Sequence, residues 1–147
     1  MKVLVSACLL GENCKYNGGN NLNESVLAFL QGHDVVSVCP EVLGGLPTPR
    51  VPAEIINGEV RAQDGRNVDA QFRKGAQEAL SIAISEGVQL AVLQSRSPSC
   101  GVNEVYDGTF QGRTIPGRGL FAQMLVEHGI HVVDASDIEN FADRSLQ

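Results

Sequence analysis

The hydrophobic positions of the chain gather in four short runs that are rich in β-branched residues. The runs cover residues 2–7, 34–39, 88–94 and 130–135, and glycine or polar residues bound them. Continuous apolar runs of this length are typical of strands that are covered on both faces. The pattern therefore predicts four strands that are buried on both faces.

Between these runs the apolar residues recur at helical spacing instead. We expect helices over residues 24–31, 69–86, 120–128 and 136–143. The longest carries one apolar face, which consists of Phe72, Ala76, Ala79, Leu80 and Ala83. Strands that alternate with helices in this way predict a parallel sheet flanked by helices.

One segment departs from this alternation. Between residues 53 and 67, Asn57-Gly58 separates two short β-prone pieces, and Asn-Gly is a signal for a tight type I′ turn,. We therefore expect a small hairpin insertion in the second crossover. A chain of 147 residues without repeats or a linker is expected to form a single α/β domain over residues 1–147,.

Composition and charge argue against several classes of protein. The 17 acidic residues outnumber the 11 basic ones, and the net charge of -6 disfavours binding to a long phosphate backbone by charge alone,. No run approaches the roughly 20 apolar residues of a membrane span, and the opening residues turn polar too soon for a signal peptide. We expect a cytoplasmic protein whose four cysteines are reduced thiols, which favours metal binding or reactivity over disulfides,.

Three of the cysteines occur where predicted strands end. Cys8 follows the first strand, Cys39 ends the second, and Cys100 lies in the loop after the third. The carboxyl ends of parallel strands share one edge of the sheet, so three thiols from remote parts of the chain could meet there. Each cysteine taken alone could equally be a small apolar residue that fills space.

The chemistry of such a site remains open at this point. Three thiolates suit either zinc with an open fourth position or an iron–sulfur cluster with one iron that the protein does not ligate. Closely spaced cysteine pairs, which are common in structural zinc sites, are absent, because Cys8 and Cys14 are six residues apart. Cys14 could complete a four-cysteine site, act as a redox partner of Cys8, or line the loop.

Polar residues beside the cysteines could move protons or hold an anion. Glu41 follows Cys39 by two residues, and Ser97 precedes Cys100 by three. Glu41 is a candidate general acid or base, whereas Ser97 could instead form a turn. An anion could bind to three loop arginines or to the free N–H groups of the helix that begins near residue 120. The arginines are Arg50, Arg113 and Arg118.

Three motifs carry a resemblance to a known family. They are VSACLLGENCKYNGG, VCPEVLGGLPTPR and QSRSPSCG, in that order. Together they resemble the small desulfidases typified by thiouracil desulfidase, and the resemblance covers nearly the whole chain. It implies a Rossmann-like fold and a [4Fe-4S] cluster held by Cys8, Cys39 and Cys100. It also implies that Glu41 and Ser97 are catalytically important.

The activity that the resemblance implies is removal of sulfur from a thiolated pyrimidine base or nucleotide, with release of sulfide. The fourth iron would take the sulfur, Glu41 would activate water, and Ser97 would orient the substrate. Cys14 departs from a strict three-cysteine site. A cluster held in this way is oxygen-labile, so aerobic preparation is expected to lose it.

Two other interpretations compete with this one. The cysteines could form a non-enzymatic metal-binding or redox-sensing module. Alternatively, the protein could remove sulfur from thiouridine in tRNA, which the acidic charge disfavours,. The sequence carries no signal for the oligomeric state.

Overall fold

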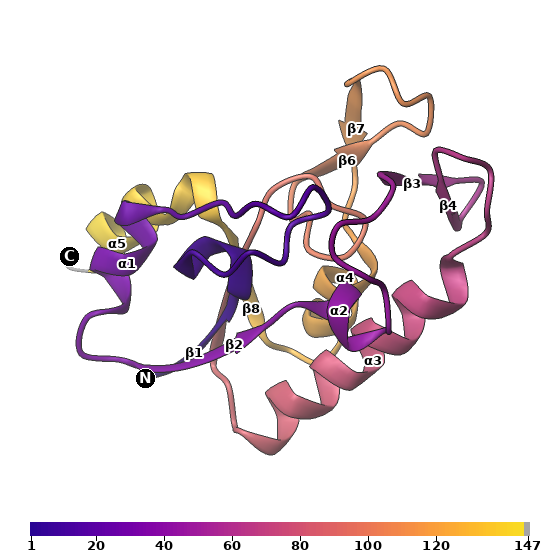
Figure 1. Ribbon diagram of the computed structural model, residues 1–147. Helices are drawn as coiled ribbons and strands as arrows, with labels where there is room; N and C mark the ends of the chain where they lie inside the picture. The colour runs from indigo at the N-terminus through magenta and orange to yellow at the C-terminus, as the bar shows by residue number, and fades with distance from the viewer. Residues whose placement is uncertain (146–147) are drawn as a thin grey trace.

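The computed structural model describes residues 1–145 and has an α/β fold (Figure 1). Its elements in chain order are β1 (Lys2–Ser6), the 3₁₀ turn η1 (Ala7–Leu10), α1 (Glu24–Leu30), β2 (Asp34–Val38), α2 (Pro40–Leu43), β3 (Ala53–Ile56), β4 (Glu59–Ala62), α3 (Asp69–Ser85), β5 (Leu90–Leu93), β6 (Glu104–Tyr106), β7 (Thr114–Pro116), α4 (Leu120–Glu127), β8 (His131–Asp134), the 3₁₀ turn η2 (Ala135–Asp137) and α5 (Ile138–Ser145). None of these helices is both long enough and apolar enough to cross a membrane.

The main sheet contains four parallel strands in the order β2-β1-β5-β8. Leu4 of β1 pairs with Val36 on one side and with Ala91 on the other, and Val92 of β5 pairs with Val133 of β8. All four carboxyl ends therefore point to the same edge. This confirms the parallel sheet that the alternating pattern predicted.

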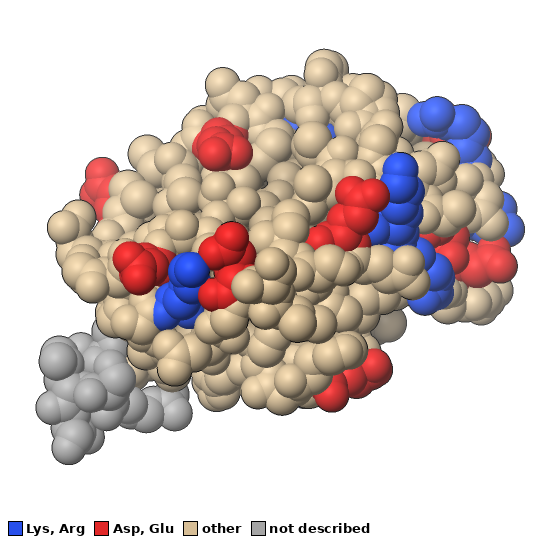
Figure 2. Space-filling model, turned by 90° about the horizontal axis from the view of Figure 1, so that it is seen from below, with Lys and Arg blue, Asp and Glu red and all other residues tan. Residues whose placement is uncertain are grey.

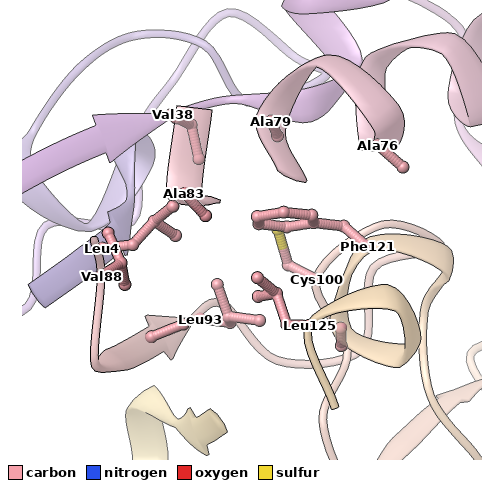
Figure 3. Packing of buried hydrophobic residues seen from close by; sticks show 12 residues of the cluster. Leu4, Val38, Ala76, Ala79, Ala83, Val88, Leu93, Cys100, Phe121 and Leu125 are labelled. Atoms are coloured by element: carbon pink, nitrogen blue, oxygen red, sulfur yellow. The ribbon is translucent and has the colours of Figure 1, made fainter. Parts of the chain in front are cut away.

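Side chains of the central strands alternate between two cores. Leu4 and Leu93 pack on the face covered by α3 and α4, where Phe121 is fully buried, whereas Val5 and Val92 pack on the face covered by α1 and α5. Figure 3 shows the first of these cores, with alanines of α3 above the Phe121 ring. Helices thus cover both faces of the sheet, as expected for a Rossmann-like arrangement.

The predicted burial of the strands is correct for β1 and β5 and wrong for β2 and for the start of β8, where His131 is exposed. Asp34, Val35 and Ser37 of β2 are exposed. The reason is position, because β2 is an edge strand of the sheet. The apolar run alone does not distinguish an edge strand from a central one.

Two antiparallel hairpins extend from this framework. In the predicted hairpin, β3 pairs with β4 through Asn57 and Gly58, whose φ angles of 52° and 81° suit a type I′ turn,. A second hairpin, formed by β6 and β7, was not predicted because its strands have only three residues each. Figure 1 shows the two hairpins next to one another, on the side of α2 and α4.

Candidate active site

A cavity of about 590 Å³ opens at the carboxyl ends of β1, β2 and β5. All four cysteines of the chain line it, together with Glu41 and Ser97. The sequence thus predicted correctly that cysteines from remote segments would converge at this edge. A different local structure holds each of these cysteines at the cavity.

Cys8 lies in the 3₁₀ turn that follows β1. Its carbonyl oxygen accepts hydrogen bonds from the N–H groups of Gly11 and Asn21, and Gly11 ends the turn with a left-handed φ of 93°,. The Asn21 side-chain amide lies 3.5 Å from the Cys8 sulfur and donates to it. The turn and Asn21 therefore fix Cys8 at the cavity.

Cys39 is the N-cap residue of α2, and Pro40 occupies the first helical position,. The Cys39 thiol lies 3.9 Å from the Cys14 carbonyl oxygen and donates to it. The short helix packs so closely on α3 that a Cβ atom added to Gly75 would overlap the Pro40 carbonyl oxygen. Glycine at this position thus lets α2 carry Cys39 and Glu41 into the cavity; the sequence pattern did not predict this helix.

Cys100 lies in the tight loop that follows β5. The hydroxyl oxygen of Ser97 accepts the Cys100 N–H at 2.7 Å, so Ser97 shapes the turn,. The Cys100 side chain is only 5% exposed and joins the core beside Phe121 (Figure 3). Cys100 therefore combines a packing role with a place at the cavity.

The start of α4 gives no support to the expected anion site. The N–H groups of Leu120 and Phe121 donate to the carbonyl oxygens of Pro98 and Ser99, at 2.7 and 2.9 Å. The expectation of free N–H groups there is wrong, because the helix begins against the Cys100 loop.

Glu41 is held at both carboxylate oxygens. Oε1 accepts a hydrogen bond from Nε of Arg50 at 3.1 Å, and Oε2 accepts one from the Ser99 hydroxyl, also at 3.1 Å. The Arg50 and Glu41 side chains are 8% and 15% exposed, so water is largely excluded from the ion pair. The two donors fix the direction of the carboxylate.

Arg50 connects this carboxylate to the loop that carries Cys14. Its Nη2 donates to the Cys14 carbonyl at 2.8 Å, and its backbone N–H donates to the Tyr16 carbonyl. Arg50 was considered as a group that could hold an anion; in the structure its partner is Glu41, and the side chain is buried instead of solvated. Neither Arg50 nor Ser99 was predicted as a partner of Glu41: Ser99 lies 58 residues away, and the loop that returns Arg50 over nine residues carries no periodic pattern.

A profile of the 2-thiouracil desulfurase family matches residues 3–137. The chain belongs to this family. A relative from Bacillus subtilis (strain 168), described as the uncharacterized protein YbbK, is 34% identical over 148 residues, which cover 94% of this chain and 98% of the relative. A solved structure of the [4Fe-4S]-dependent thiouracil desulfidase TudS is 38% identical, with a TM-score of 0.90 and 99% of both chains covered. The family and the fold predicted from the sequence are thus confirmed.

The thiols of this 2-thiouracil desulfurase family member influence one another. Hydrogen bonding to Cys14 lowers the pKa of Cys39 to about 7, and it also lowers the pKa of Cys8. The pKa of Cys14 is raised above its ordinary value by the same hydrogen bonds, more by the one to Cys39 than by the one to Cys8. Burial raises the pKa of the Cys100 thiol. Cys14 thus affects the protonation of both Cys8 and Cys39, whereas burial dominates at Cys100.

The donor set at the cavity consists of four thiols. Thiolates are the ligands that iron–sulfur clusters use. Within residues 1–145, no three His, Cys, Asp or Glu side chains lie close enough together to hold one ion.

Proposed function

We propose that this protein is a [4Fe-4S]-dependent desulfidase that hydrolyses the carbon–sulfur bond of a thiolated pyrimidine and releases sulfide. The observation that carries the proposal is the convergence of thiols from three strand ends, with the clamped Glu41, on one cavity. The likeness to TudS, a [4Fe-4S]-dependent thiouracil desulfidase, supports it.

In this proposal Cys8, Cys39 and Cys100 hold the cluster. When bound, the cluster would supply an iron without a protein ligand, which acts as a soft Lewis acid toward the sulfur. Cys14 lies in a loop whose neighbouring side chains Glu12, Asn13 and Tyr16 are exposed, whereas Cys8, Cys39 and Cys100 follow strand ends. We therefore assign Cys14 no obligatory ligand role.

Glu41 acts as the general base. The overall reaction adds water to a C=S carbon and replaces it by C=O, with sulfide as the other product, so no electrons are exchanged. Glu41 would take a proton from the attacking water onto its carboxylate, which Arg50 and Ser99 keep directed into the cavity,. The Ser99 hydroxyl and the Arg50 guanidinium are positioning groups in this scheme.

Ser97 orients the substrate. Its hydroxyl oxygen already accepts the Cys100 N–H, which leaves the hydroxyl proton free to donate,. Ser97 lines the cavity, so this proton can bind a carbonyl or thiocarbonyl group of the pyrimidine. The same hydrogen bond couples the position of Ser97 to that of Cys100.

The cavity and the charge distribution favour a small substrate. A volume of about 590 Å³ is in the usual range for small-molecule sites, and Lys15, Arg96 and Glu54 line it with both signs of charge,. On the face shown in Figure 2, the described basic side chains lie beside acidic ones instead of forming a continuous basic surface. The cavity volume and the net charge of -6 therefore favour a thiolated base or nucleotide over thiouridine in tRNA,.

Anaerobic turnover tests this function. Protein reconstituted with iron and sulfide is incubated with 2-thiouracil, 4-thiouracil and 4-thiouridine phosphate, and sulfide and the desulfurised product are measured together. We expect equal amounts of both from at least one compound, and none from zinc-loaded protein. Brown, cluster-loaded protein that turns over none of them would contradict the proposal. A colourless protein that retains one zinc per chain would instead support the non-enzymatic metal-binding module.

A further inference from the structure

A second glutamate lines the cavity and has no part in the scheme above. Glu54 of β3 is only 7% exposed and has no basic partner among the described side chains. Its Oε1 accepts the N–H groups of Gly108 and Phe110, at 2.9 and 3.1 Å. A carboxylate of the first hairpin thus anchors the loop of the second.

The loop between β6 and β7 is closely fitted to this anchor. A Cβ atom added to Gly108 would lie 3.0 Å from the Ile55 carbonyl oxygen, so the loop backbone lies directly against β3. Phe110 has a φ of 57°, an uncommon conformation for an aromatic residue,. The hydrogen bond from Phe110 to Glu54 therefore holds a backbone shape that the residue does not favour by itself,.

The anchored loop places an aromatic ring at the cavity. Phe110 lines it, and so do Tyr16 and Tyr106, which are both of the tyrosines in the chain. No aromatic residue is needed at a site that only holds a cluster. A planar heterocycle, by contrast, packs well against such rings.

We propose that Phe110 contacts the ring of the thiolated pyrimidine and thereby contributes to its affinity, and that Glu54 is the positioning residue that holds Phe110 there. This inference rests on the proposed function. It assigns the two hairpins a joint role as the wall of the substrate site, opposite the loop that carries Tyr16.

The contact between Phe110 and the substrate is tested by steady-state kinetics. Phe110→Ala should raise KM for a turned-over thiopyrimidine by about tenfold or more while kcat per cluster changes little, because stacking binds the ground state and the transition state alike. Phe110→Leu keeps most of the side-chain volume but not the aromatic face, so its KM should lie between those of the wild type and Phe110→Ala. The exposed Ile115 on β7 supplies a matched control, since Ile115→Ala should leave KM unchanged.

Glu54 is tested by exchange of the loop amides, without turnover. Glu54→Ala should accelerate hydrogen exchange at Gly108 and Phe110 and raise KM, whereas Glu54→Gln keeps an acceptor oxygen and should restore both. Glu59→Ala, which changes an exposed glutamate of the same hairpin, should alter neither. Calorimetric binding of uracil to cluster-free protein should weaken in parallel for Phe110→Ala and Glu54→Ala.

The outcomes separate this inference from the function on which it rests. If the wild type turns over a thiopyrimidine and Phe110→Ala keeps the same KM, the inference is wrong and the function stands. If Glu54→Ala raises KM while the loop amides stay protected, Glu54 is not a positioning residue. Should Glu54→Ala fail to fold, Phe110→Leu and Glu54→Gln still decide the result. If no thiopyrimidine is turned over, the proposed function itself fails.

Discussion

The loops after β5 and after β1 both bring a cysteine to the cavity, but they are held in opposite ways. In the loop after β5, Ser99 and Cys100 are 1% and 5% exposed, and the Ser99 carbonyl accepts the N–H of Phe121. In the loop after β1, Cys14 is half-buried among exposed polar neighbours, and Arg50 binds its carbonyl. A thiol built into the core supports a fixed ligand, whereas a thiol held by polar contacts can move.

The largest effect is expected from the core-built thiol. Cys100→Ala should abolish cluster binding, because the remaining thiols cannot replace a ligand that approaches from the core side. The cluster-free variant should still fold, with a melting temperature within about 5 °C of the cluster-free wild type, since alanine keeps the site apolar. Iron analysis after anaerobic reconstitution and thermal melting measure the two effects. Wild-type iron content in Cys100→Ala would contradict the assignment.

Glu41→Gln should leave iron content unchanged and reduce turnover per cluster by about 10²–10⁴, because the amide cannot take a proton from water. Glutamine has the same shape as glutamate and can still form a hydrogen bond with the Ser99 hydroxyl. Thermal melting of the variant shows whether the fold is intact. The rate of sulfide release per mole of intact cluster is the measurement. Normal turnover per cluster would show that Glu41 is a structural carboxylate.

Arg50→Lys breaks the connection between Glu41 and the loop that carries Cys14. Lysine keeps the positive charge but cannot bind Glu41 and the Cys14 carbonyl together, so turnover should fall by up to about 100-fold through misplacement of the carboxylate,. Hydrogen exchange should accelerate over residues 14–20 and stay unchanged over residues 97–101. Equal acceleration in both segments would mean that the loops are not held independently.

Ser97→Ala removes a hydroxyl that serves the turn and the substrate. We expect about a tenfold loss of turnover with most of the cluster iron retained, since backbone contacts of the loop persist, including that between Gly101 N–H and the Ser97 carbonyl,. Ser97→Thr keeps the hydroxyl and is the matched control. If the variant loses iron as well as activity, Ser97 serves only to hold the Cys100 loop.

The smallest effect is expected at Cys14. Cys14→Ser should retain most of the cluster iron and turn over within about twofold of the wild type, because the half-exposed loop tolerates the change. Parallel iron assays on the serine variants of Cys8 and Cys39 give the comparison. Equal iron loss in all of them would show a closed four-cysteine site with no iron left for substrate.

The sequence predicted the features that follow from a parallel sheet, but not the order of its strands. Convergence of Cys8, Cys39 and Cys100 was predictable, because parallel strands bring their carboxyl ends to one edge whatever the side-chain details. The edge position of β2 was not, since its apolar run resembles that of β1. Whether a strand is central or at the edge depends on the order of the strands in the sheet, which no local sequence pattern encodes.

The contacts that direct chemistry were the least predictable. Glu41 was identified by its place after Cys39, but its partner Ser99 comes from a remote segment, and Arg50 returns to it from the loop after α2. The same holds for Glu54 and Phe110, which are 56 residues apart and meet only because two hairpins pack together. Their positions depend on tertiary packing, which short-range periodicity does not encode.

Mössbauer spectroscopy of protein reconstituted anaerobically with ⁵⁷Fe addresses the open iron itself. With Cys8, Cys39 and Cys100 as the only ligands, one iron in four should give a distinct signal, and addition of 2-thiouracil or 4-thiouracil should shift that signal alone. Cys14→Ser should give the same spectrum. Four equivalent irons that do not respond to either compound would contradict a three-cysteine site with an iron available to sulfur.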